Sequence, residues 1–136
     1  MTVRRPEVSV GAVVVRDGRL LLVRRGRGAA VGKWSVPGGR VEWGETLAAA
    51  VVRELHEETG LNGVCEQAIG WVERIGADYH YVIVDFVVSV TDGDVRAADD
   101  ASDAAWVDID DVGGWPPVVD GLIEFLAEHG IVRSSR

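Results

Sequence analysis

The feature that most constrains this chain is a cluster of glutamates inside one predicted helix. The segment 46–59 places its apolar residues on one arc at about 100° per residue, and Gly60 suits a left-handed C-terminal cap. Glu54, Glu57 and Glu58 fall on an adjacent arc, because their spacing is i, i+3 and i+4. A chain that forms this helix therefore holds three carboxylates within about one turn.

Such a cluster is costly for a helix unless a cation neutralises it. Like charges at this spacing repel each other, and the helix dipole disfavours negative charge near a C-terminus. Hard oxygen ligands at this density suit Mg²⁺ or Mn²⁺. The alternative is a solvated acidic face, because glutamate is a good helix former. The residues around the glutamates decide between the two.

Those surrounding residues form a longer motif with fixed distances. Gly39 is followed by five residues and Glu45, and then, after seven more, by the run Arg53-Glu54-Leu55-His56-Glu57-Glu58-Thr59-Gly60-Leu61. A chance match to its glycine, arginine and glutamate positions is on the order of 10⁻⁸ per starting position. The order G-x5-E-x7-R-E-L-x-E-E-x-G-L resembles the Nudix box, the signature of Nudix hydrolases, without substitution at any fixed position.

The resemblance implies a reaction and a set of metal ligands. Nudix hydrolases cut the diphosphate linkage of a nucleoside diphosphate joined to a further group, NDP-X, into NMP and phospho-X. By position in the motif, the metal ligands are expected to be Glu54, Glu57 and Glu58. A backbone carbonyl of the turn at Gly38-Gly39, whose glycines allow backbone angles closed to other residues, is expected to join them. The cofactor is then Mg²⁺ or Mn²⁺.

The same resemblance gives the remaining motif residues supporting roles. Arg53 is expected to orient the carboxylates and to pair with Glu45. In some relatives the residue that matches Glu54 is also the general base, and in others an acid on a loop is the base. Asp100, in the acidic stretch 97–101, is the candidate loop acid. Both bases stay open at this point.

A basic patch precedes the motif. Arg24, Arg25, Arg27 and Lys33 form the only dense group of positive charges in an acidic chain. Arginine matches phosphate oxygens bidentately, so Arg25 and Arg27 are candidates for substrate binding, together with Asp100. A solvated arginine loop is the alternative.

The order of predicted elements indicates an α/β fold. Strand-like runs occur at 8–16, 20–24, 34–36, 66–74, 79–91 and 104–108. Asp17-Gly18 predicts a hairpin turn between the first two runs. A final helix is predicted to open at 115–117, with an apolar stripe of Val118, Leu122, Phe125 and Leu126. The Nudix resemblance implies an α/β/α sandwich with a mixed β-sheet, and the length of 136 residues indicates a single domain over residues 1–136.

Composition and charge limit the kinds of partner and the location that this chain can have. A net charge of −8 argues against binding long nucleic acids, whose phosphates need a basic face, but not against a small nucleotide held through a metal. No apolar run reaches the ~20 residues that span a bilayer. The single cysteine, Cys65, excludes an internal disulfide and favours a reducing, cytoplasmic location. The apolar 79–90 strand and the five tryptophans favour a homodimer.

The substrate stays open among three classes. The overall sequence resembles ADP-ribose and nucleotide-sugar pyrophosphatases, although Gly76-Ala77 stand where many ADP-ribose enzymes have a proline. Tyr79, eighteen residues beyond Leu61, resembles the tyrosine marker of dinucleoside polyphosphate hydrolases. MutT-type cleavage of (d)NTPs is the third class. A non-catalytic Nudix sensor is a remote alternative, because such domains typically lose box carboxylates.

A few residues outside the motif are candidates for the cleft. Asp85 interrupts an apolar strand, and a solvent-facing position is the favoured interpretation. Core positions are the usual place for aromatic residues, but five could stack on a base: Trp34, Trp43, Trp71, Tyr79 and Tyr81.

Overall fold

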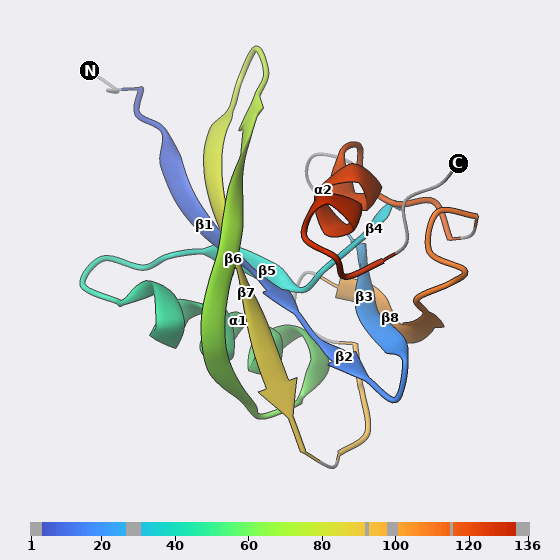
Figure 1. Ribbon diagram of the computed structural model, residues 1–136. Coiled ribbons are helices and arrows are strands. Elements are labelled where there is room, and N and C mark those ends of the chain that lie inside the picture. The colour runs from blue at the N-terminus through green and yellow to red at the C-terminus, as the bar shows by residue number, and fades with distance from the viewer. Residues whose placement is uncertain (1–3, 27–30, 92, 98–100, 115, 133–136) are drawn as a thin grey trace.

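A mixed β-sheet forms the centre of the computed structural model, which describes residues 4–26, 31–91, 93–97, 101–114 and 116–132 (Figure 1). Its four strands lie in the order β5 (Gly38–Arg40), β1 (Glu7–Val13), β7 (His80–Val90) and β6 (Gly63–Ile75). β1 and β7 run parallel, whereas the β1–β5 and β6–β7 pairs are antiparallel. The predicted mixed sheet is confirmed.

A second, antiparallel sheet continues from the end of β1. It consists of β2 (Val15–Arg16), β3 (Arg19–Arg25), β4 (Trp34–Ser35) and β8 (Ala101–Asp108). Asp17 and Gly18 have φ values of 53° and 74°, as a two-residue type I′ hairpin turn requires. The predicted hairpin is confirmed for β2 and β3, while β1 pairs with strands of the first sheet.

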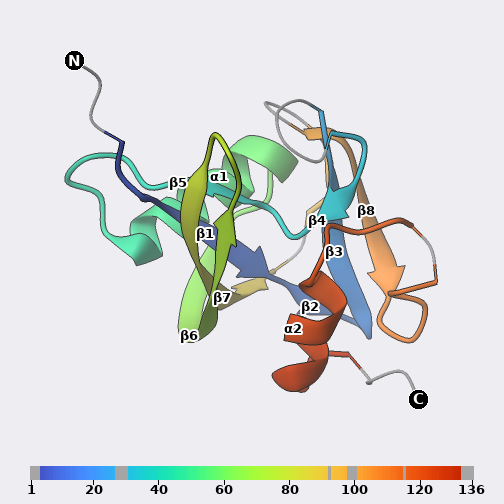
Figure 2. The same ribbon diagram turned by 90° about the horizontal axis from the view of Figure 1, so that it is seen from above.

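Two helices pack on opposite sides of the strands, as Figure 2 shows: α1 (Leu47–Thr59) and α2 (Leu122–Glu128). Alternate residues of β1 point to the two sides. Val10 packs in one core cluster with Val51 and Leu55 of α1, and Val13 packs in the other with Phe125 of α2. The expected α/β architecture is therefore confirmed. Neither helix within the described ranges is long and apolar enough to cross a bilayer.

The predicted start of the final helix is wrong. α2 begins at Leu122, after Gly121 with a φ of 83°, and Val118 lies outside it. The backbone around Val118 pairs with Trp34 instead: Trp34 N donates to Pro117 O at 2.8 Å, and Val119 N donates to Trp34 O at 2.9 Å. The conformation around Val118 is therefore set by a strand more than eighty residues away in the sequence. Local periodicity cannot show such a pairing.

Candidate functional site

Helix α1 is fixed at both ends by local contacts, and the C-terminal one, at Gly60, was predicted. The Thr46 hydroxyl accepts a hydrogen bond from Ala49 N, and Gly60 takes a left-handed conformation with a φ of 79°. Val51 and Leu55 are fully buried against the first sheet. Because Val51 and Leu55 face the sheet, Glu54 and Glu58 lie on the side of the helix that faces β5.

Glu58 is the most deeply buried of the three carboxylates. Its side chain is 7% exposed, and its Oε1 accepts a hydrogen bond of 2.7 Å from Gly38 N. A backbone contact near Gly38 was expected to involve a carbonyl and a metal. This N–H bond attaches the end of α1 directly to β5, and the carbonyl ligand stays a prediction.

Gly39 lies against the carboxylate of Glu54. A Cβ atom at position 39 would overlap with the carboxyl carbon and both oxygens of Glu54. A Cβ atom at Gly38 would likewise overlap with the carbonyl of Val10 in β1. Both glycines are therefore required by close approach, because no larger residue leaves room for the neighbouring groups.

Arg53 connects the box residues. Its Nε and Nη2 bind both carboxylate oxygens of Glu45 at 2.7 and 2.9 Å. Its Nη1 donates to Glu54 Oε1 at 2.8 Å and to Glu57 Oε2 at 3.2 Å, while Nη2 also donates to Arg40 O at 3.0 Å. One guanidinium thus joins the loop before α1, strand β5 and two of the helix carboxylates.

These bonds shift the ionisation of the Arg53–Glu45 pair. The hydrogen bond from Arg53 is the main cause that lowers the pKa of Glu45 to about 2, and the backbone N–H of Glu42 adds to it. The hydrogen bond to Glu45 raises the pKa of Arg53, and Glu54 and Glu57 raise it further, against the opposing effect of burial. Both groups are therefore charged throughout the physiological range.

The three carboxylates differ in exposure, and two of them, Glu54 and Glu58, contact β5. Glu57 is the most exposed, Glu54 is partly covered and Glu58 is buried. Within the described ranges, no three His, Cys, Asp or Glu side chains already surround one point as cation ligands. Carboxylates held this close nevertheless have the chemistry of a site for a hard, oxygen-binding cation.

The predicted substrate-binding residues lie outside helix α1 and the box, and the structure describes only some of them. Arg25 ends β3 in the second sheet, where its backbone N–H donates to Lys33 O at 2.9 Å. Lys33 makes an exposed ion pair of 3.4 Å with Asp120. Arg27 and Asp100 lie outside the described residues, so their predicted roles stay predictions.

Asp85 is buried, so its predicted solvent-facing position is wrong. It is 5% exposed on the face of the first sheet opposite α1, where its carboxylate occupies the space above Gly11. Gly70 and Gly11 flank it on the neighbouring strands, and Gly38 continues the row in β5. Burial raises the pKa of Asp85 to about 6, although the charge of Arg74 opposes the shift. A glycine on each neighbouring strand is the signal that could have indicated this burial.

The sequence is similar to a known domain family and to curated proteins of several organisms. A model of the NUDIX domain matches residues 5–128. The ADP-ribose pyrophosphatase of Methanocaldococcus jannaschii is 35% identical over 109 residues, which cover 79% of this chain and 64% of that protein. The putative 8-oxo-dGTP diphosphatase 2 of Mycobacterium tuberculosis is 35% identical over 129 residues, covering 89% of this chain and 88% of that protein.

Solved structures show the same fold. The MutT NUDIX hydrolase of Burkholderia pseudomallei has a TM-score of 0.78 at 32% identity, over 90% of this chain and 97% of that one. The MutT protein of Methanosarcina mazei has a TM-score of 0.84 at 26% identity, over 94% of this chain and 96% of that one. The chain spans 64% of the length of its Methanocaldococcus relative, which is less than two thirds.

Proposed function

The chain belongs to the NUDIX family, and from this premise we propose that it is a metal-dependent pyrophosphohydrolase that cleaves NDP-X to NMP and phospho-X. The observation that carries the proposal is the arrangement around β5. The Gly38 N–H holds Glu58 and Gly39 lies against Glu54, so two carboxylates contact edge strand β5, and Arg53 joins Glu57 to Glu54.

The carboxylates would hold the cofactor. Glu54, Glu57 and Glu58 are the residues that would bind Mg²⁺ or Mn²⁺, which when bound would offset phosphate charge and favour attack at phosphorus. The carboxylates fit this role because they supply hard oxygens on one helical turn and are fixed by Arg53 and Gly38. The bidentate bond from Arg53 to Glu45 fixes the guanidinium itself.

Glu54 is the proposed general base. A water oxygen bonds to one phosphorus, the bridging P–O bond breaks, and the proton that Glu54 accepts passes to a product phosphate. Arg53 holds Glu54 Oε1 at 2.8 Å, which fixes the carboxylate beside Gly39. Asp100 is the alternative base, with Glu54 then serving as a ligand alone.

ADP-ribose or a nucleotide sugar is the favoured substrate class. The name of the Methanocaldococcus relative supports it. The name of the Mycobacterium relative supports a (d)NTP as the second candidate, and Tyr79 supports a dinucleoside polyphosphate as the third. The exclusion of long nucleic acids and the cytoplasmic location are part of the same proposal, supported by the net charge of −8 and the lone Cys65.

A hydrolysis screen tests this proposal. Purified protein with Mg²⁺ or Mn²⁺ is incubated with ADP-ribose, nucleotide sugars, (d)NTPs and dinucleoside polyphosphates, and NMP release is measured. Turnover should fall to background in excess chelator and return when the cation is restored. Full turnover in excess chelator would contradict the proposed role of the carboxylates.

A further inference from the structure

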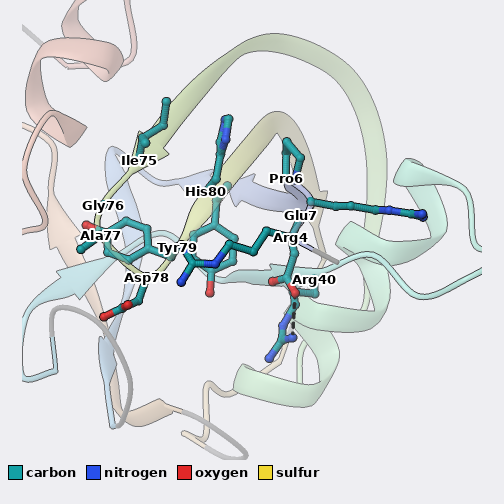
Figure 3. Close-up of a pocket in the computed structure, with 12 residues that line it drawn as sticks. Arg4, Pro6, Glu7, Arg40, Ile75, Gly76, Ala77, Asp78, Tyr79 and His80 are labelled. Atoms are coloured by element: carbon teal, nitrogen blue, oxygen red, sulfur yellow. Dashed lines mark hydrogen bonds and ion pairs between the residues drawn. The ribbon is translucent and has the colours of Figure 1, made fainter. Parts of the chain in front are cut away.

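A cavity of about 550 Å³ lies apart from the box carboxylates, at the open end of the first sheet. Its walls come from the segment before β1, the end of β5 and the turn between β6 and β7, as Figure 3 shows. This volume lies in the range of small-molecule sites. None of the steps proposed for hydrolysis uses the side chains that line it.

Two stacked tyrosines form the aromatic wall of the cavity. The ring centroids of Tyr79 and Tyr81 are 5.7 Å apart, with 22° between the ring planes. Tyr79 folds back over the turn, where a Cβ atom at Gly76 would overlap with its ring. Gly76 N donates to Tyr79 O at 2.9 Å, which closes this turn. Because Tyr79 is still 41% exposed, part of the ring is open to a ligand.

Three arginines and two acidic residues, Glu7 and Asp78, also line the cavity. Arg4 extends across the cavity toward Tyr79 (Figure 3), and Arg5 lines it as well. Neither has a hydrogen bond or ion pair to any residue that the structure describes. Arg40 lies at the lower edge, in an exposed pair of 3.4 Å with Glu7. Cations gathered beside aromatic rings in a chain of net charge −8 favour an anionic, planar ligand.

Arg40 also connects this cavity to the box. Its side chain lines the cavity, while its carbonyl accepts a 3.0 Å hydrogen bond from Arg53, the residue that holds Glu54 and Glu57. Arg40 directly follows Gly39, which lies against Glu54. A ligand that reaches from the cavity along β5 therefore approaches the carboxylates.

We propose that the cavity formed by Arg4, Arg40, Tyr79 and Tyr81 binds the nucleoside monophosphate part of the substrate. The base stacks on Tyr79 beneath the Arg4 guanidinium, and the phosphate points past Arg40 toward the box. The inference rests on the proposed function for the identity of the substrate. Binding of the nucleotide itself needs neither a metal nor hydrolysis.

Calorimetric titration of AMP into the wild-type chain in excess chelator tests the proposal. Ribose 5-phosphate and pyrophosphate are titrated in parallel, because they carry the phosphate without the base. AMP should bind, and ribose 5-phosphate should bind at least about tenfold more weakly, which is the scale of base stacking on an aromatic ring. No AMP binding, or equal binding of ribose 5-phosphate, would overturn the inference.

Variants locate the site. Tyr79→Ala should weaken AMP binding about tenfold or more, whereas Tyr79→Phe keeps the ring and should bind as wild type does. Arg4→Gln should also weaken AMP binding. Because Arg4 lies in the segment before β1, this variant leaves the turn at residues 76–79 unchanged. Arg19→Gln, an exposed arginine of β3, is the matched control. AMP affinity unchanged in both Tyr79→Ala and Arg4→Gln would place the nucleotide elsewhere.

One further variant separates this inference from the proposed function. Glu57→Gln should lose hydrolysis but keep AMP affinity, because Glu57 does not line the cavity. Inactive wild-type protein that still binds AMP through Tyr79 would refute the proposed hydrolysis and leave the cavity assignment intact.

Discussion

The backbone N–H of Gly38 donates a 2.7 Å hydrogen bond to Oε1 of Glu58, so the last turn of α1 is attached to edge strand β5. Glu58 is buried at this contact. A buried carboxylate is stable only when it is hydrogen-bonded or paired, and a backbone donor meets part of that need. The contact explains how a helix can hold a crowded set of carboxylates at the edge of a sheet.

A methyl group at position 39 should disrupt catalysis more than folding. Gly39→Ala places its Cβ in the space of the Glu54 carboxylate, which must move away from Arg53. We expect kcat to fall about 10²-fold, because a displaced base or ligand loses its geometry. Gly114→Ala is the control, since a Cβ there meets only Asp111 O at an ordinary 3.5 Å. Equal kcat for the two variants would show that a Cβ atom at position 39 does not displace the Glu54 carboxylate.

The pair formed by Glu45 and Arg53 should make stability depend on acid pH. The pKa of Glu45 is lowered from 4.5 to about 2, so its contribution is fully present above pH 4.5 and is lost as the pH falls through about 2. Glu45→Gln lacks this contribution. Its melting temperature should therefore lie below that of the wild type at pH 6, and the gap should narrow from pH 4.5 to pH 2. A gap that does not change with pH would argue against an ionic contribution.

Asp85 should have the opposite pH dependence. Its pKa is raised from 3.8 to about 6, so ionisation destabilises the folded state as the pH rises from about 4 to 6. Asp85→Asn should be more stable than the wild type above pH 6, by roughly 2–3 kcal/mol, and the difference should vanish below pH 4. Denaturant titrations at several pH values measure it, with the exposed Asp94→Asn as control. Destabilisation by Asp85→Asn at pH 7.5 would show that the carboxylate is well paired.

The proposed homodimer should depend on β6. The strand that first suggested a dimer is β7, but it lies between β1 and β6 and has no free edge. β6 is an edge strand, and its Trp71 is 67% exposed. Light scattering of the wild type should give twice the mass of one chain, and Trp71→Ser should shift it to a single chain. A single-chain mass for the wild type at micromolar concentration would reject the dimer.

The sequence predicted the parts of this structure that are determined locally. The C-terminal cap of α1 at Gly60, the hairpin turn at Asp17-Gly18 and the approach of Glu54 and Glu57 to one another through Arg53 follow from spacing and backbone preference, and all are present. Val118 and Asp85 were misplaced, because their positions depend on Trp34 and Gly11, residues distant in sequence. Pairing between strands far apart in the sequence decides such positions, and local spacing does not show which strands pair.

Glu54, Glu57 and Glu58 are proposed to form the catalytic centre. Measuring kcat with saturating Mg²⁺ for Glu54→Gln, Glu57→Gln, Glu58→Gln and Glu45→Gln tests this most directly. Each of the first three should lose at least about 10²-fold in kcat, because each loses a charge that a cation or a proton transfer needs. Glu45→Gln should lose less, since Glu45 acts through Arg53. If Glu45→Gln is the most damaging while Glu57→Gln and Glu58→Gln stay near wild type, these carboxylates are not the catalytic centre.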